Sequence, residues 1–188
     1  MPQSAPAHNI CLFCGSRPGH GPEFLAEAEA LGQTLAARGL GLVYGAGDLG
    51  LMGAAARAAK AAGGRVTGFI PRHLLDREVG NPGLDAMIVT ETMHERKKLM
   101  FENSDAVVAL PGGPGTLDEL IEVLTWRQIG LHARPIVLIS TGGYWQPLLD
   151  LIDHLIGHGF ADTGFRAYYD VVGTAEEAVT LLQTKLTG

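Results

Sequence analysis

The sharpest chemical signal in the sequence is a glycine-rich turn that joins an apolar segment to a helix. Residues 111–116 read Pro-Gly-Gly-Pro-Gly-Thr and follow the apolar run 105–110. Three glycines at the start of a helix expose successive N–H groups, and the helix dipole adds to their positive potential, so the turn predicts an anion site. No Lys-Ser or Lys-Thr pair follows the glycines, which excludes a P-loop and favours a monophosphate over a triphosphate. The alternative is a turn shaped by packing alone.

A carboxylate stands one helical turn beyond these glycines. Thr116 and Glu119 fit a capping box, in which Thr116 would cap the helix and Glu119 would reach back to the backbone. The same spacing places Glu119 near the position of a ribose attached to a bound phosphate. We therefore expect Glu119 to act on the ligand rather than only to cap the helix.

A second segment, residues 93–103, combines cations and apolar residues on one helical face. At about 100° per residue, Met93, Arg96, Lys97 and Met100 point the same way. Burying a charge without a partner is costly, so this stripe predicts an anion or a carboxylate close to the two cations. The alternative is that both cations extend to solvent along the helix surface.

Segments of two kinds alternate along the chain and must position these residues. Short apolar segments predict strands, and longer amphipathic segments predict helices. Their alternation predicts a Rossmann-like, doubly wound α/β fold, with a parallel sheet covered by helices on both faces. Ligands bind such sheets at the carboxyl ends of the strands. The expected strands are 9–14, 41–45, 65–70, 85–89, 105–110, 135–140 and 169–172, the expected helices are 23–38, 51–62, 93–103, 116–129, 144–158 and 175–185, and the glycine-rich turns after strands are 14–19, 45–50, 111–116 and 141–144.

Length and composition limit the class of protein. The 188 residues are 46% hydrophobic and 18% charged, and no linker divides them, so we expect one domain over 1–188 with a frayed segment at 1–8. The formal net charge of -6 argues against a general nucleic-acid binder, because such proteins carry basic patches. No apolar run is long enough for a membrane span and no signal peptide is indicated, so we expect a cytoplasmic protein without membrane partners.

Three weaker motifs have ordinary structural explanations. Residues 45–50 match the dinucleotide fingerprint G-x-G-x-x-G, but no carboxylate follows about 20 residues later to hold a ribose, so we expect close packing or another ligand. Cys11 and Cys14 have C-x-x-C spacing, but their odd separation on a strand places them on opposite faces. His154 and His158 share a helix face without a third ligand nearby in sequence. We therefore expect no metal or redox centre.

Taken together, these residues resemble the LOG family of cytokinin riboside 5'-monophosphate phosphoribohydrolases, formerly labelled lysine decarboxylase-like proteins. The resemblance covers nearly the whole chain, and its most specific parts are the signatures Met-His-x-Arg-Lys and Pro-Gly-Gly-x-Gly-Thr-x-x-Glu. It implies a Rossmann-like homodimer that cleaves the base from a nucleoside 5'-monophosphate and releases ribose 5-phosphate, without a metal or organic cofactor. The base would be adenine or an N6-prenylated adenine.

The resemblance also implies roles for single residues. Arg96 and Glu119 match the catalytic arginine and glutamate of the two signatures. Two residues depart from the family pattern, since Ala46 stands where glycine is common and Pro114 removes one N–H donor from the phosphate turn. The expected substrate-binding residues are Lys97, Gly112, Gly113, Pro114, Gly115, Thr116 and Thr125, with Glu78 added by its spacing from Arg96.

Two other functions stay open at the level of sequence. A non-catalytic nucleotide carrier or sensor could use the same fold, and it would bind a monophosphate without turnover. A pyridoxal-phosphate decarboxylase, which the older family label suggests, would need a Schiff-base lysine, and no lysine here has suitable surroundings. For a hydrolase, the positive charge that develops on the sugar requires a carboxylate. Glu119 is the candidate for that role, and Arg96 would orient Glu119 and the substrate.

Overall fold

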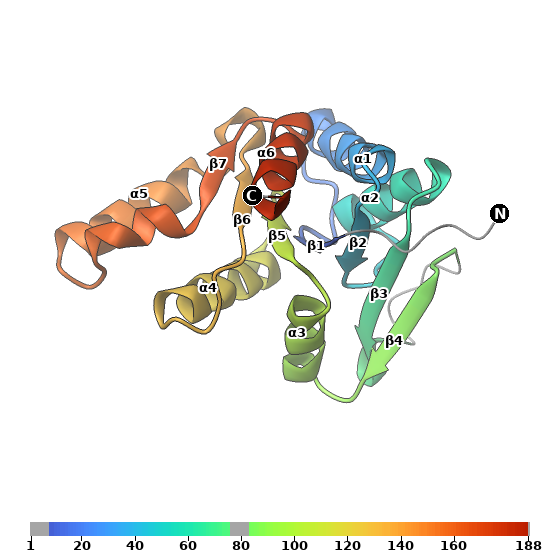
Figure 1. Ribbon diagram of the computed structural model, residues 1–188, viewed down its shortest axis with the longest axis horizontal. Helices are drawn as coiled ribbons and strands as arrows, with labels where there is room; N and C mark the ends of the chain where they lie inside the picture. Colours follow the sequence, from blue (N-terminus) through green and yellow to red (C-terminus); the bar gives the residue numbers. More distant parts are fainter. Residues whose placement is uncertain (1–7, 76–82, 188) are drawn as a thin grey trace.

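A computed structural model describes residues 8–75 and 83–187, and within them the strands form one parallel sheet (Figure 1). The strand order is β4-β3-β2-β1-β5-β6-β7. This order, with helices on both faces, confirms the predicted Rossmann-like, doubly wound α/β fold. The strands are β1 (Asn9–Phe13), β2 (Gly41–Tyr44), β3 (Val66–Pro71), β4 (Ala86–Thr90), β5 (Ala106–Ala109), β6 (Ile136–Ile139) and β7 (Asp170–Val172).

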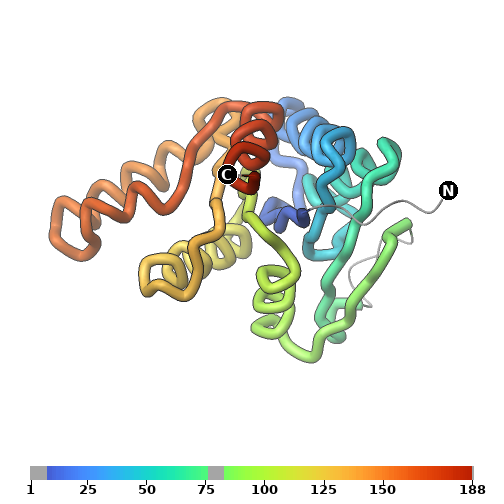
Figure 2. The backbone as a smooth tube through the Cα atoms, viewed as in Figure 1, coloured from blue at the N-terminus to red at the C-terminus, as the bar shows by residue number. Residues whose placement is uncertain are grey.

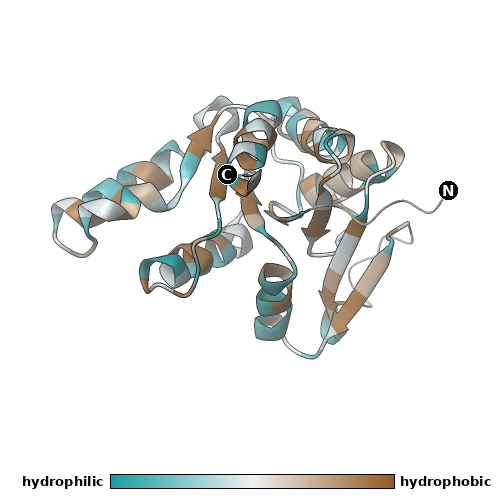
Figure 3. Cartoon of the chain, in the orientation of Figure 1, coloured by the Kyte–Doolittle hydropathy of each residue, from teal (hydrophilic) through white to brown (hydrophobic). Residues whose placement is uncertain are grey.

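Two hydrophobic cores lie on opposite faces of the sheet. Alternate residues of each strand supply them, so Ile10 and Leu12 pack on one side while Cys11 and Phe13 pack on the other. Figure 3 shows the contrast between the hydrophobic central strands and the mainly hydrophilic α3. No helix among the described residues is long and apolar enough to cross a membrane. One face is covered by α1 (Pro22–Ala37), α2 (Gly50–Ala61) and α6 (Ala175–Thr187), and the other by α3 (Met93–Glu102), α4 (Pro114–Gln128) and α5 (Gln146–Gly157).

The strand order reverses between β1 and β5, which lie side by side at the centre of the sheet. Ile10 pairs with Ala106 in the register of these two strands, and Phe13 pairs with Ala109. The chain continues from β1 toward β2 on one side and from β5 toward β6 on the other. The turns after β1 and β5 therefore diverge, and the crevice between them is where doubly wound sheets bind ligands.

Short 3-10 helices are the main elements that the sequence did not predict. The first, η1 (Arg72–Leu74), follows β3, and the second, η2 (Thr141–Gly143), precedes α5. Because η2 occupies the glycine turn, α5 begins at Gln146 rather than at residue 144. Figure 2 shows the chain turning back along α5 through η3 (Thr163–Tyr168) before it enters β7.

Candidate active site

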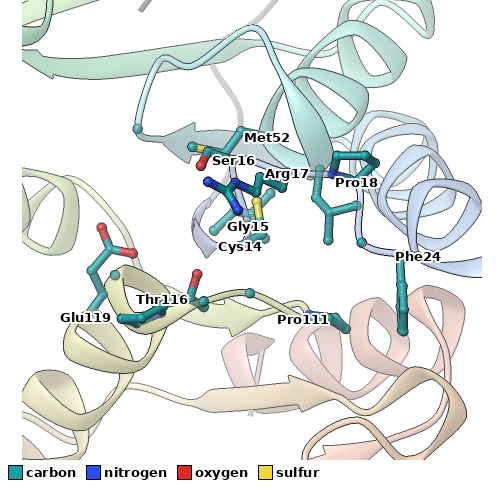
Figure 4. A pocket seen from close by; sticks show the side chains of 18 of the residues that line it. Cys14, Gly15, Ser16, Arg17, Pro18, Phe24, Met52, Pro111, Thr116 and Glu119 are labelled. Carbon is teal, nitrogen blue, oxygen red and sulfur yellow. The ribbon is translucent and has the colours of Figure 1, made fainter. Parts of the chain in front are cut away.

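A cavity of about 600 Å³ opens at the carboxyl ends of the central strands (Figure 4). Its walls include the turn 14–19 after β1, the turn 111–116 after β5, and side chains from α2, α3 and α4. In Figure 4, Glu119 and Thr116 lie across the cavity from Arg17. The two segments that the sequence singled out therefore meet in one pocket, at the place where the strand order reverses.

The start of α4 differs from the expected capping box. The helix begins at Pro114 with Gly113 as N-cap, and no side chain caps it, so the prediction that Thr116 and Glu119 form a capping box is wrong. Proline starts a helix well, because its fixed φ suits the first helical position and the missing N–H would have no acceptor there. The N–H groups of Gly115 and Thr116 have no acceptor within the helix and remain available to a ligand.

Neighbouring elements hold the turn 111–116 in place. The Gly15 N–H donates to the Pro111 carbonyl over 3.0 Å, which ties the turn after β1 to the turn after β5. On the other side, the Tyr144 hydroxyl donates to the Gly112 carbonyl over 2.6 Å. A side chain at Gly112 would overlap the Thr116 hydroxyl, so this position requires glycine.

The Arg96 side chain extends from α3 to the backbone of two neighbouring strand segments. Its Nε donates to the Phe69 carbonyl within β3, and its Nη2 donates to the Gly45 carbonyl just after β2, both over 3.0 Å. Nη1 lies 3.3 Å from the Met93 sulfur. The side chain lines the cavity and only 6% of Arg96 is exposed, so the alternative that it extends to solvent is wrong. Carbonyls and a thioether leave its positive charge without a carboxylate ion pair among the described residues, and that charge can act on a ligand.

Glu119 lines the same cavity from the first turns of α4 and is half-buried. Burial raises the pKa of its carboxyl to about 7, with the nearby charge of Arg96 acting in the opposite direction. The carboxylates of Asp118 and Glu122 raise this pKa further, and Lys97 lowers it. A carboxyl group poised near neutral pH can both accept and return a proton, as general acid–base catalysis requires.

Two expected binding residues, Lys97 and Thr125, lie apart from the cavity lining. Lys97 is only 7% exposed, and its ammonium contacts Asp118 at 2.9 Å and Glu122 at 3.0 Å. Burial alone would lower the pKa of Lys97, but these two partners raise it, so the lysine stays charged and joins α3 to α4. Thr125 is exposed farther along α4, where its hydroxyl donates to the Ile121 carbonyl over 2.8 Å. Glu78 lies outside the described residues.

Sequence reasoning missed the side chains that the turn after β1 brings to the cavity. Ser16 and Arg17 line it opposite α4, although the sequence had marked this turn only for its glycines. Phe24 and Tyr144 also line it, with their rings packed edge to face at 5.8 Å. The sequence could have directed attention to this turn, because it follows a strand and ligands bind doubly wound sheets at the carboxyl ends of strands, but its place beside the turn after β5 required the strand order.

The weaker motifs follow their structural explanations. In the 45–50 segment, a side chain at Gly50 would overlap the backbone of Ser16, so this glycine serves close packing. Cys11 and Cys14 belong to different cores, and burial raises the pKa of both thiols, which keeps them protonated. Across the described chain, no group of three or more His, Cys, Asp or Glu side chains is arranged to hold a metal ion.

Known proteins share both the sequence and the fold. The family described as "Possible lysine decarboxylase" matches residues 52–182. A probable cytokinin riboside 5'-monophosphate phosphoribohydrolase, LOG4 of Oryza sativa subsp. japonica, is 43% identical, and the match covers 94% of this chain and 77% of the rice protein. The phosphoribohydrolase LOG5 of Arabidopsis thaliana is 42% identical over 93% of this chain and 76% of its own.

Solved structures show the same arrangement of elements. The molybdenum cofactor carrier protein of Chlamydomonas reinhardtii aligns with a TM-score of 0.76, covering 98% of this chain and 100% of the algal chain. The two sequences are 24% identical, so this likeness concerns the fold alone.

Proposed function

Because the chain belongs to the LOG family, whose relatives are named cytokinin riboside 5'-monophosphate phosphoribohydrolases, we propose that it hydrolyses the N-glycosidic bond of a nucleoside 5'-monophosphate. The products are the free base and ribose 5-phosphate. The observation that supports the proposal is one cavity that combines the uncapped start of α4, the buried cation Arg96 and the carboxyl of Glu119 with a pKa of about 7. These are the groups that a phosphate and a developing sugar cation require.

The reaction can be written with these groups in place. Breaking the bond between C1′ and the base sends the electron pair to the base and leaves positive charge on the ribose ring. The Glu119 carboxylate stabilises that charge and takes a proton from the attacking water, whose oxygen bonds to C1′. Arg96, held by the carbonyls of Phe69 and Gly45, orients the carboxylate and the substrate relative to each other. The net reaction delivers hydroxide to C1′ and a proton to the base.

We also propose that the base is adenine or an N6-prenylated adenine. The cavity offers an apolar wall for it, formed by Leu51 and Met52 of α2 with Met93 and Met100 of α3. Methionine side chains adapt to flat and irregular apolar groups, which suits both a purine ring and a prenyl chain. Comparing turnover of AMP with its N6-prenylated form tests how well this wall fits each base.

Release of base from AMP, followed by chromatography, tests the proposed function. We expect free adenine and ribose 5-phosphate in equal amounts, and much slower release from adenosine, because adenosine lacks the anion. Tight binding of AMP without release of base would favour a carrier or sensor and would overturn the hydrolase proposal. Equal rates with AMP and adenosine would show that binding of the phosphate at the start of α4 does not contribute to turnover.

We propose a homodimer whose contact involves the outer face of α4. Leu117 and Ile121 lie one turn apart on α4 and are 37% and 41% exposed, and Ile129, directly after the helix, is 64% exposed, so an apolar surface lies beside the cavity. Light scattering should give twice the mass of one chain, and Ile121→Asp should give the mass of one chain. Leu151→Asp, at an exposed leucine of α5, is the matched control. Dissociation by the control but not by Ile121→Asp would place the contact elsewhere.

A cytoplasmic location is also part of the proposal, supported by two free thiols. Cys11 and Cys14 are unpaired, as is usual in a reducing compartment. Cell fractionation with an antibody against the protein tests this location.

A further inference from the structure

The turn after β1 carries one cation that has no partner among the described residues. Arg17 is exposed and lines the cavity, and within residues 8–75 and 83–187 it makes no hydrogen bond or ion pair. Figure 4 shows its guanidinium pointing into the cavity, on the side that faces Thr116 and Glu119. Some other arginines are paired with carboxylates, as Arg38 is with Glu176, and others donate to backbone carbonyls, as Arg96 does.

The backbone that carries Arg17 is fixed relative to the start of α4. The Gly15 N–H bonds the Pro111 carbonyl, and the Gly15 carbonyl accepts a 3.1 Å hydrogen bond from the Leu51 N–H at the start of α2. Two turns and a helix therefore meet at Gly15, directly before Ser16 and Arg17. The long arginine side chain can move, but its point of attachment cannot move far from the phosphate turn.

A second observation on the opposite wall points to a ligand. Thr116 is only 4% exposed, its hydroxyl is aimed into the cavity, and no other described residue bonds that hydroxyl. The hydroxyl faces the cavity and not a protein acceptor, so a polar group that enters the cavity can form a hydrogen bond with it. The hydroxyl lies beside the N–H groups that the helix start leaves available.

The start of α4 alone does not neutralise a phosphate monoester. A monoester carries about -1.5 to -2 charges at neutral pH, whereas a helix start supplies about half a positive charge. Arg96 is held by the carbonyls of Gly45 and Phe69 and also acts on Glu119. The chain as a whole is acidic, with a formal net charge of -6, and provides no general attraction for an anion.

We propose that Arg17, assisted by the Ser16 hydroxyl, binds the substrate's phosphate from the wall opposite α4. The phosphate then lies between the Arg17 guanidinium and the Gly113–Thr116 backbone, and the fork of donors on Arg17 matches two phosphate oxygens. Arg17 is a specificity residue that distinguishes the 5'-monophosphate from the free nucleoside. This inference rests on the proposed function and names the residue that provides its phosphate selectivity.

The test compares Arg17→Ala, Arg17→Lys and the control Arg38→Ala in the full-length protein. Losing a charge-assisted hydrogen-bonded contact should weaken binding about 10- to 100-fold. We expect Arg17→Ala to raise KM for AMP by that factor while kcat changes only a few-fold, and to leave kcat/KM for adenosine unchanged. Arg17→Lys should lie between Arg17→Ala and the wild type, because lysine keeps the charge but not the fork. Arg38→Ala should match the wild type.

A binding measurement separates this inference from the proposed function. Calorimetric titration with ribose 5-phosphate should show the same 10- to 100-fold loss in Arg17→Ala, whether or not base is released. If the protein binds ribose 5-phosphate through Arg17 but releases no base, the hydrolase proposal fails and the phosphate contact stands. If AMP is hydrolysed with equal KM by Arg17→Ala and wild type, the phosphate contact fails and the hydrolase stands. An equal loss with adenosine would also overturn the assignment to phosphate.

Discussion

The rate of base release should depend on the protonation state of one carboxyl group, that of Glu119. It sits in the cavity on a helix start that it does not cap, and burial brings its pKa to about 7. We expect Glu119→Gln to lower the rate of base release at least about 100-fold, because glutamine cannot stabilise a sugar cation or take a proton. The base-release assay measures this effect, with Glu29→Gln, an exposed carboxylate on α1, as control. Retained activity in Glu119→Gln would require another carboxylate, such as Glu122.

The same residue should make the protein's stability depend on pH. Because the folded-state pKa of Glu119 is raised from 4.5 to about 7, the folded protein holds the proton more tightly than the unfolded chain between these values. Stability is therefore lost as pH rises from about 4.5 to about 7, and above that range the ionised carboxylate keeps a constant cost. Since Glu119 is partly exposed, that cost is on the order of 1–3 kcal/mol.

Glu119→Gln removes this cost, so the variant should melt above the wild type at pH 8 and close to it at pH 4. Melting curves at both pH values check the difference, and Glu29→Gln should show no such dependence. A variant that is less stable than wild type at pH 8 would mean that the carboxylate has a favourable partner in the folded state.

At the scale of elements, Arg96 joins α3 to β2 and β3 through two carbonyl groups. A methyl group at Gly45 would overlap the guanidinium of Arg96. Gly45→Ala must therefore displace this side chain while keeping its functional group. We expect a folded protein whose kcat falls at least about 10-fold, since small misplacements of a positioning group are costly. Kinetics and circular dichroism check this, with Gly157→Ala as control, because a methyl group there meets no atom within 4 Å. Unchanged kcat in Gly45→Ala would show that Arg96 tolerates displacement.

The sequence predicted the elements better than the connections between them. Strands and helices follow from apolar patterns repeated over many residues, and each helix of the structure begins within about two residues of its predicted start. The start of α4 was missed because Thr116 is a good cap in general, whereas Pro114 fits the first helical turn here.

The walls of the candidate site depended on contacts between distant segments. Glu119 and Arg96 could be named from their signatures, but the ion pairs of Lys97 with Asp118 and Glu122 require the packing of α3 against α4. Arg17 carries no local pattern of its own. Arg17 can be recognised as a cavity residue only once the structure places the turn after β1 beside the turn after β5.

For the whole molecule, binding of product should stabilise the fold. A ligand present at 100 times its Kd adds about 2.7 kcal/mol to the free energy of unfolding, and in a domain of 188 residues each kcal/mol shifts the Tm by about 2–4 °C. We expect ribose 5-phosphate at that excess to raise the Tm by about 5–10 °C, as thermal denaturation would show. Ribose should produce no comparable shift. A similar rise with ribose would indicate that recognition of the sugar, not of the phosphate, dominates binding.

The central pairing of β1 with β5 has a consequence for how the chain acquires its structure. Ile10 and Ala106 are neighbours in the sheet although nearly a hundred residues separate them, so this contact closes a long loop and forms slowly. During synthesis, β1 can pair with β2 early, but the other edge of β1 stays unpaired until β5 has left the ribosome. That edge carries apolar side chains on both faces, which makes the nascent chain a candidate for chaperone binding during this interval.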